Sequence, residues 1–193
     1  MDVILAANKV GEQGKVVGID FTHQMIERAK QTVTEAGLKD RSIELCVADM
    51  GNSQLPDSCT DVVISNCVIN LCSDKDAVYK EAFRILRPGG RLAISDIVFT
   101  NDINPELRER FQLSWAGCLG GAIAEKEYWQ TVKKAGFVEI QIVAHHTLTP
   151  EELEAMACCP GEDFTPPPAE EDLALVGGNV ASVKFTAVRP SLS

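Results

Sequence analysis

The sequence has little positive charge, and this shortage narrows the classes of partner that the protein can bind. Lysine and arginine together number 18 against 28 aspartates and glutamates, which gives a formal net charge of −10 at pH 7. Nucleic acids and anionic membrane surfaces attract basic patches on a protein. We therefore expect neither a nucleic acid nor a membrane surface among the partners.

Long hydrophobic runs and paired cysteine motifs are also missing. No apolar stretch approaches the ~20 residues of a membrane span. Residues 1–14 make a poor signal peptide, because they contain an early acid and only a short apolar segment. The seven cysteines are odd in number and include no CxxC pair. This pattern favours a reducing cytoplasm over a disulfide framework or a structural zinc site, so we expect a cytoplasmic location.

What the sequence does contain is an alternation of short apolar runs with longer amphipathic segments. The 193 residues suffice for one domain with a sizeable core. Strands are expected at 15–19, 42–47, 61–65, 91–97, 138–143 and 181–188. Helices are expected at 2–10, 23–36, 74–86, 105–115, 125–135 and 150–157. Pro88, Gly89 and Gly90 are expected to turn the chain. The order indicates an α/β fold with a mainly parallel sheet.

A glycine-rich loop is absent from the place where a nucleoside-binding fold needs it. Asp20 ends the strand at 15–19, where such a fold puts an acid on the ribose hydroxyls. The glycine loop lies ~20 residues before that acid, and counting back from Asp20 reaches Met1. Gly11, Gly14 and Gly18 follow a predicted helix and precede a strand, which is the wrong order. We expect the first strand and its loop to lie before this chain begins.

The two acids at the ends of early strands each have a simpler interpretation. Thr22 can cap the helix at 23–36, and Asp20, which comes just before it, could be a simple helix-capping acid. Asp49 follows the strand at 42–47 and could meet an adenine edge or be a plain loop acid. The residues alone leave both alternatives open.

Two cysteines occupy positions that suit chemistry. Cys67 follows Ser65 and Asn66 at the carboxyl end of the strand at 61–65, where α/β sheets bind ligands. The alternative for Cys67 is a buried structural thiol, which is common for free cysteine. Cys118 lies among glycines in AGCLGGA, a segment with little core to fill.

Five segments together resemble arsenite methyltransferases, which are class I enzymes dependent on S-adenosylmethionine. They are GKVVGIDFTHQMIERAK, CVADM, DVVISNCVINL, LRPGGRLAISDIV and WAGCLGGA. The LRPGG segment is typical of class I methyltransferases broadly, whereas SNCVINL together with AGCxxGA is much narrower. The resemblance runs from about Asp2 to the end of the chain. Family members carry, before that point, a strand with an acidic glycine-rich loop and a further arsenic-binding cysteine.

The resemblance implies a class I methyltransferase-like (Rossmann-like) fold that lacks its first strand. Residues 1–100 would form a partial core for S-adenosylmethionine, and residues 101–193 a C-terminal part with the arsenic-site loop and the final strands. Asp20 matches the acid on the ribose hydroxyls, and Thr22 and Met25 match the segment beside the cofactor. Ala48, Asp49 and Met50 match the segment that meets the adenine. Ser65 and Asn66 match the end of the strand under the methionine part. The implied cofactor-binding residues are Asp20, Thr22, Met25, Ala48, Asp49, Met50, Ser65 and Asn66.

The same resemblance assigns Cys67 and Cys118 as the catalytic pair that holds trivalent arsenic. Thiolates are soft ligands that favour soft centres. Arsenic bound in this way keeps a lone pair that can attack the sulfonium methyl group, so most of the rate would come from positioning and no general base is needed. The implied partners are arsenite or its thiol conjugates and a thiol reductant, in an arsenic-detoxifying reaction.

Several alternatives stay open at this point. The chain could be a small-molecule C- or O-methyltransferase of the same fold, acting for example on a quinone precursor. It could also be a non-catalytic arsenite-binding fragment, or a truncated product with no function of its own. Cys72, Cys158 and Cys159 could reach the arsenic or be uninvolved. The family order would place the missing strand at the centre of the sheet, between the strands at 15–19 and 61–65, and its loss would leave two unpaired edges that cost stability and invite aggregation. We expect this chain to bind S-adenosylmethionine weakly or not at all.

Overall fold

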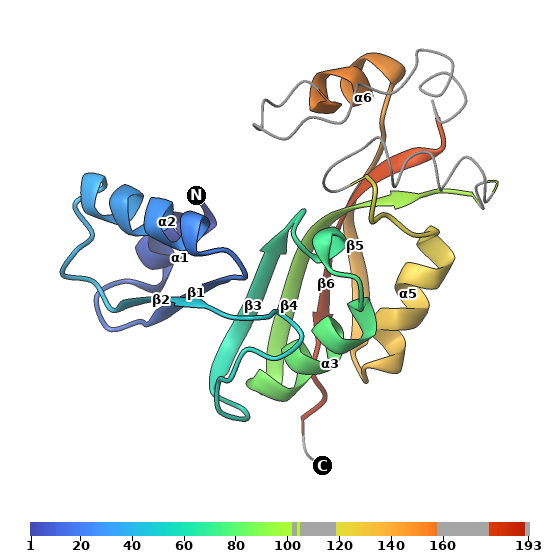
Figure 1. Ribbon diagram of the computed structural model, residues 1–193. Coiled ribbons are helices and arrows are strands. Elements are labelled where there is room, and N and C mark those ends of the chain that lie inside the picture. The colour runs from blue at the N-terminus through green and yellow to red at the C-terminus, as the bar shows by residue number, and fades with distance from the viewer. Residues whose placement is uncertain (102–103, 105–118, 158–177, 192–193) are drawn as a thin grey trace. The chain divides into compact units, whose positions relative to one another are not determined.

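Figure 1 shows the protein as a computed structural model, which describes residues 1–101, 104, 119–157 and 178–191. The chain divides into two compact units, Met1–Leu55 and Pro56–Ser193. Within the described residues, no helix is long and apolar enough to cross a membrane. The expectation that residues 1–100 form a partial core for S-adenosylmethionine, and residues 101–193 the part with the arsenic-site loop, stays a prediction.

The first unit is built from two helices and a two-stranded parallel sheet. Its elements in order are α1 (Asp2–Val10), β1 (Val16–Asp20), α2 (His23–Glu35) and β2 (Ile43–Val47). The two strands pair in register from Val16 opposite Ile43 to Asp20 opposite Val47. As the sequence predicts, Thr22 begins α2, because its hydroxyl accepts a hydrogen bond from the Met25 N–H at 3.3 Å.

The second unit holds a four-stranded sheet with its helices. Its elements in order are β3 (Thr60–Asn66), η1 (Ile69–Leu71), α3 (Lys75–Ile85), β4 (Leu86–Phe99), α5 (Glu125–Lys134), β5 (Val138–Thr147), α6 (Pro150–Ala157) and β6 (Val180–Val188). The strand order is β3-β4-β6-β5. β3 and β4 are parallel, whereas β6 runs antiparallel to both β4 and β5. The predicted α/β class is confirmed, and half of the four strand pairs are parallel.

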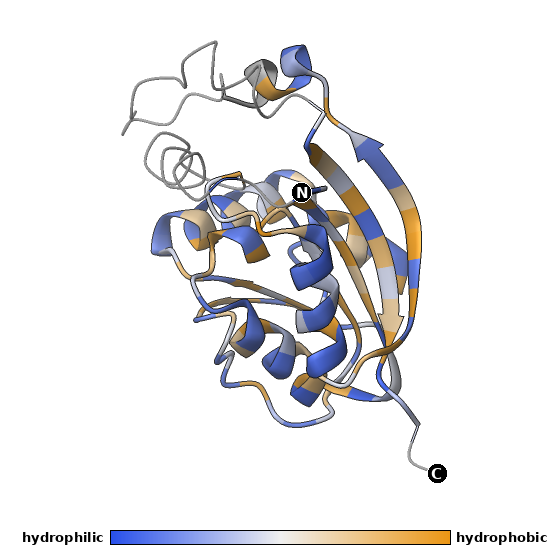
Figure 2. Ribbon diagram, turned by 90° about the vertical axis from the view of Figure 1, so that its right-hand side faces the viewer, coloured by the Kyte–Doolittle hydropathy of each residue, from blue (hydrophilic) through white to orange (hydrophobic). Residues whose placement is uncertain are grey.

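The core of the second unit lies between its sheet and its helices. α3 and α5 contact each other, and both contact β4. Apolar residues recur along the strands, and the helices present many hydrophilic residues (Figure 2). The largest fully buried side chains include Tyr79 on α3, Tyr128 on α5 and Phe185 on β6. These rings meet edge to face, with centroids 5.9 Å apart for Tyr79 and Tyr128 and 6.0 Å apart for Tyr128 and Phe185.

The LRPGG segment differs from the turn that its composition predicts. β4 starts at Leu86 and continues through the two glycines to Phe99. The bend is absorbed inside the strand: Gly89 takes a φ of 78°, and the register with β3 shifts between Thr60 and Val62. A proline and a glycine at an irregularity of an edge pairing are tolerated in a strand.

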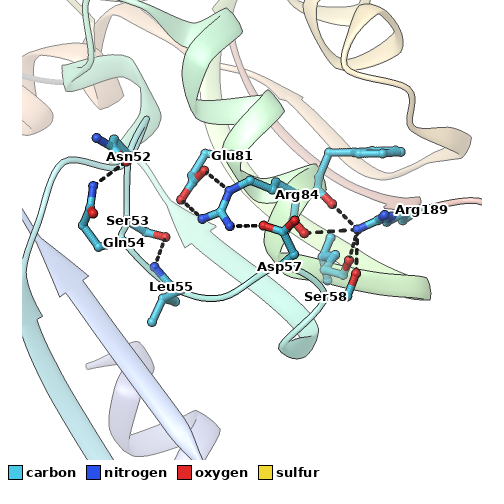
Figure 3. A network of polar contacts seen from close by, with 11 residues as sticks. Asn52, Ser53, Gln54, Leu55, Asp57, Ser58, Glu81, Arg84 and Arg189 are labelled. Atoms are coloured by element: carbon cyan, nitrogen blue, oxygen red, sulfur yellow. Dashed lines mark hydrogen bonds and ion pairs between the residues drawn. The ribbon is translucent and has the colours of Figure 1, made fainter.

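An arginine near the C-terminus ties the end of α3 to the end of β6. Arg189 donates through one guanidinium nitrogen to the carbonyls of Phe83 at 2.8 Å and Arg84 at 3.1 Å, and also to that of Leu86 (Figure 3). Arg84 in turn pairs with Glu81 at 2.7 Å and with Asp57. These contacts satisfy carbonyls that a helix end leaves without partners.

β1 and β3 are among the strands that keep an open side in the described part of the chain. β1 pairs only with β2, and β3 lies at the end of its sheet and pairs only with β4. On β3 the apolar residues Val62 and Ile64 are 48% and 49% exposed. These two strands are the ones between which the resemblance expects a further strand, and their predicted tendency to aggregate stays a prediction.

Candidate functional site

The turn that follows β3 holds Cys67 in an unusual backbone conformation. β3 and β4 pair in parallel up to Asn66 opposite Ser95, and the Cys67 N–H then donates to the Ser95 carbonyl at 2.8 Å. Cys67 has a φ of 56°, in the left-handed region that costs a side-chain-bearing residue roughly 1–2 kcal/mol. Strained residues of this kind concentrate at functional sites, so the outlier supports a role for Cys67 beyond packing.

The side chains around this turn are partly buried. Cys67 is half-buried and packs against an apolar cluster whose members are Ile97, Phe99, Leu119, Ala122, Leu148, Leu153 and Val180. The hydroxyl oxygen of Ser65 is buried and has no hydrogen-bond partner among the described residues. Asn66 is exposed, and Cys72 is half-buried after η1. A buried hydroxyl without a partner is uncommon and points to a contact that the described residues do not supply.

In the first unit, the predicted cofactor residues gather where β1 and β2 end. The Ala48 N–H donates to the Asp20 carbonyl at 3.0 Å, which joins the two strand ends. Oδ1 of Asp20 accepts hydrogen bonds from the backbone N–H and the hydroxyl of Thr22, both at 2.8 Å. Oδ2 of Asp20 makes no hydrogen bond within the described residues. Thr22 is therefore the helix cap, and Asp20 orients it while keeping one carboxylate oxygen free.

Asp49 organises the loop that follows β2. Its Oδ1 accepts from the Gly51 N–H at 2.6 Å, and its carbonyl accepts from the Asn52 N–H at 3.0 Å. The Asp49 side chain is exposed, Met50 beside it is half-buried, and Met25 on the first turn of α2 is 47% exposed. The edge of the small sheet where β1 and β2 end thus presents the carboxylates of Asp20 and Asp49 and the thioether of Met25 to solvent.

The candidate residues are divided between the two units. Asp20, Thr22, Met25, Ala48, Asp49 and Met50 belong to the first unit, and Ser65, Asn66 and Cys67 to the second. Cys118, Cys158 and Cys159 lie outside the described residues. A cavity of about 220 Å³ in the first unit contains none of the candidates, since its lining runs from Lys30 on α2 to Leu45 on β2.

Sequence reasoning missed a buried polar network beside the Cys67 turn. Tyr79 donates through its hydroxyl to that of Tyr128 at 2.6 Å, and Tyr128 donates to Oδ2 of Asp96 at 3.0 Å. Oδ1 of Asp96 accepts from the Ile97 N–H at 3.0 Å. Burial raises the pKa of Asp96 to about 6. The only signal in the sequence is an aspartate within the apolar strand LAISDIV, which by itself names no partner.

The family follows from comparison with known proteins. A model described as "Methyltransferase domain" matches residues 1–136 of the chain. The chain belongs to this methyltransferase domain family. Among its relatives is an arsenite methyltransferase from Halobacterium salinarum, 37% identical over 141 residues that cover 73% of this chain and 35% of the relative. Another is the Homo sapiens arsenite methyltransferase, 32% identical over 155 residues, or 77% of this chain and 41% of that protein.

The fold is shared with solved structures. An arsenic(III) S-adenosylmethionine methyltransferase from Chlamydomonas reinhardtii matches with a TM-score of 0.76 and 26% identity, over 99% of this chain and 60% of that one. The resemblance to arsenite methyltransferases and the methyltransferase-like fold are confirmed. The chain spans 35% to 42% of the length of the curated arsenite methyltransferases that it matches.

A more distant relative bears on the alternative substrate. The demethylmenaquinone methyltransferase of Listeria monocytogenes is 33% identical over 93 residues, which cover 48% of this chain and 38% of the relative. The similarity to arsenite methyltransferases extends over a larger share of the chain.

Proposed function

We propose that this chain carries the arsenic-binding part of an S-adenosylmethionine-dependent arsenite methyltransferase, with Cys67 and Cys118 as the arsenic ligands. The observation that carries the proposal is Cys67 itself, held at a φ of 56° at the carboxyl end of β3. Of the four described non-glycine residues with a positive φ, Cys67 is the one that follows the carboxyl end of a parallel strand. The relatives named above are the second support, because they carry arsenite methylation in their names.

The thiol chemistry suits trivalent arsenic. Two cysteine sulfurs would bind the arsenic and leave it a lone pair. When bound, S-adenosylmethionine supplies a methyl group on a positively charged sulfur. The lone pair would form the new arsenic–carbon bond, and the electrons of the broken carbon–sulfur bond would return to that sulfur. The arsenic is oxidised by two electrons, and a thiol reductant returns it to the trivalent state.

The residues at the ends of β1 and β2 fit the nucleoside half of the cofactor. Oδ2 of Asp20 is free to accept from ribose hydroxyls, because Thr22 occupies only Oδ1. Ala48, Asp49 and Met50 follow β2 at the same edge and are proposed to meet the adenine. For the methionine half we propose Ser65, whose buried hydroxyl has no partner among the described residues, together with Asn66.

We further propose that this 193-residue chain binds the cofactor weakly or not at all. Its nucleoside residues lie on the sheet of β1 and β2, and its methionine residues follow β3, which belongs to a different sheet. Each half-site therefore lies on a strand, β1 or β3, that keeps an open side among the described residues. A cytoplasmic location and a role in arsenic detoxification belong to the same proposal, supported by the odd number of cysteines and by the arsenic ligands.

The test is arsenite binding to the purified chain, measured by titration at equal folded fraction. We expect that Cys67→Ser and Cys118→Ser each abolish binding, whereas Cys59→Ser, which removes an exposed thiol, leaves it unchanged. If the folded protein does not bind arsenite, the proposal is overturned. Isothermal titration with S-adenosylmethionine tests the cofactor half, and tight binding would contradict the expected weakness.

The second candidate is methyl transfer to carbon of a quinone precursor, which the Listeria relative favours. That reaction does not require a pair of cysteine thiolates. The double variant Cys67→Ser/Cys118→Ser would therefore keep activity toward a quinone precursor, whereas arsenite methylation would be lost. A chain that binds arsenite without any methyl transfer would instead be a binding fragment.

A further inference from the structure

A cavity of about 220 Å³ lies in the first unit, between the second half of α2 and the first residues of β2. The described residues that line it include no acid, although the whole chain has 28 acidic residues against 18 basic ones. Positive side chains gathered around a cavity raise the local concentration of anions. The lining contains the cations Lys30, Lys39 and Arg41, and apolar side chains that include Val33, Ile43 and Leu45.

The loop that carries two of these cations is fixed to the end of α2. Gly37 has a φ of 68°, and the Leu38 N–H donates to the Val33 carbonyl at 3.1 Å, which is the pattern of a helix that ends on a left-handed glycine. The Arg41 N–H then donates to the Leu38 carbonyl at 3.0 Å, and the Ile43 N–H donates to the Arg41 carbonyl at 2.8 Å. The backbone hydrogen bonds of this loop therefore hold Arg41 beside the cavity before any ligand binds.

The guanidinium group of Arg41 is partly buried and lacks a partner. Its Nη1 is one of three buried side-chain atoms without a hydrogen bond in the described part of the chain, and it is the only charged one. Neither Arg41 nor Lys39 forms an ion pair within the described residues, whereas Lys30 pairs with Glu27 at 2.6 Å. Asp40 lies between the two in sequence, is exposed and does not line the cavity. Because burying a charge costs free energy unless it is paired, an oxyanion bound to Arg41 would offset that cost.

The size and the apolar walls of the cavity limit what the oxyanion can be attached to. An apolar cavity of ~150 Å³ holds one benzene molecule. About 220 Å³ therefore gives room for one benzene-sized ring and one oxyanion group. Pockets for larger ligands have ~300–1,000 Å³, so a molecule of the size of S-adenosylmethionine does not fit.

From these observations we infer that the first unit binds a small oxyanion, a carboxylate or a phosphate ester carried on one apolar ring, with Arg41 and Lys39 as its partners. The planar guanidinium suits both groups, because it can donate two parallel hydrogen bonds to either. The cofactor residues proposed at positions 48–50 follow the carboxyl end of β2, whereas the cavity is lined from its first residue, Ile43. Five residues of strand separate Ile43 from Ala48, a span of about 16 Å. The inference therefore concerns a second site and does not rest on the proposed arsenic chemistry.

The experiment titrates the full chain, with isotope-labelled methyl groups, with benzoate and with phenyl phosphate, and follows the methyl resonances by NMR. We expect saturable shifts at Ile43 and Leu45, which line the cavity, and none at Ile69, which is buried in the second unit. Phenyl phosphate should bind at least about 10-fold more tightly than inorganic phosphate, because its ring removes apolar surface from water.

Substitutions test the cationic partners. Arg41→Gln should weaken binding of the bound probe by about 10-fold or more, because it removes charge-assisted hydrogen bonds. The matched control is Arg28→Gln, which removes the same charge from an exposed position on α2 outside the cavity and should change binding by less than about 2-fold. If Arg41→Gln unfolds the first unit, Arg41→Lys replaces it. This variant keeps the charge and loses the planar fork, so binding should weaken by about 3-fold.

The outcomes decide the inference without any measurement on arsenite, so it can hold where the proposed function fails. Shifts at Ile43 and Leu45 with only one of the two probes support it and identify the oxyanion group. The inference is overturned if neither probe shifts these resonances, or if inorganic phosphate binds as tightly as phenyl phosphate. Binding that is unchanged in Arg41→Gln, or in Arg41→Lys in its place, overturns it as well.

Discussion

The two units differ sharply in how much apolar surface they bury. Of the 27 buried hydrophobic residues in the described part of the chain, only Ala7, Ile26 and Val33 lie in the first unit, and the other 24 lie in the second. The first unit instead exposes Leu5 at 58% and Phe21 at 51%. A two-stranded sheet with so small a core is marginal in water. The half-site proposed for the nucleoside therefore lies in the unit with the smaller core, and the turn proposed to bind arsenic lies in the unit with the larger core.

The largest effect expected from this difference is in amide hydrogen exchange of the whole chain. Amides of β4 and β6, which pair along nine positions from Arg91 to Phe99, should exchange only through opening of the larger unit. Amides of β1 and β2 should exchange at least about 100-fold faster, because their local opening exposes little apolar surface. Exchange is measured by mass spectrometry. If the amides of the two sheets exchange equally slowly, the two units do not differ in local stability.

A matched pair of core truncations sharpens the same comparison. Phe185 is 1% exposed and meets the Trp129 ring edge to face at 4.9 Å. Phe185→Ala should cost about 3–5 kcal/mol and unfold the larger unit at lower denaturant. Ile26→Ala, in the first unit, should leave the unfolding midpoint of the larger unit within error. Circular dichroism with tryptophan fluorescence follows this directly, because Trp115 and Trp129 both lie in the second unit. A shift of the tryptophan transition by Ile26→Ala would show that the units unfold together.

The buried carboxyl of the second unit predicts an unusual pH dependence. Burial raises the pKa of Asp96 to about 6, above its value of about 3.9 in an unfolded chain. The folded state therefore binds this proton more tightly, and the stability that it confers is present below about pH 4 and is lost as the pH rises through about 6.

Asp96→Asn removes this titration while the Tyr79 and Tyr128 hydroxyls can reorient toward the amide. At pH 7 the variant should be more stable than the parent by about 3 kcal/mol, and the difference should vanish near pH ~4. Urea unfolding at several pH values measures it. Comparing variant with parent cancels the opposite effect of exposed acids such as Asp76 and Glu44, whose pKa values Lys134 and Lys15 lower. A constant difference across this range would exclude Asp96 as the titrating group.

Local patterns in the sequence predict most elements, because caps and short apolar runs act over a few residues. Thr22 caps α2 as predicted, Asp74 caps α3 where a helix is expected, and the strand ends bring Asp20 next to Ala48. Parallel strands end at one edge of a sheet, which is why two acids that follow successive strands can be assigned to one site from the sequence alone.

What the sequence does not reveal depends on contacts between distant residues. The position of β6 between β4 and β5, the hydrogen bond from Tyr128 to Asp96, and the contact of Gly121 with Asn70 each join segments at least 32 residues apart. No local periodicity encodes such pairs. The bend within LRPGG is predicted as a turn because proline and glycine favour one locally, and the sequence does not reveal that Leu86 and Arg91, on either side of the bend, both pair with β3.

The smallest effect expected is a difference in stability between two Cys67 variants, and it separates the backbone strain at Cys67 from the role of its thiol. At Cys67 the left-handed backbone disfavours any residue with a Cβ by roughly 1–2 kcal/mol, and a glycine in the unfolded chain offsets about half of this. Cys67→Gly should therefore be about 1 kcal/mol more stable than Cys67→Ala, which loses the same sulfur and keeps the strain. Both variants should lose arsenite binding. If alanine is the more stable of the two in chemical denaturation, the φ of 56° is not a source of strain, and the argument that Cys67 is kept for its chemistry loses its main support.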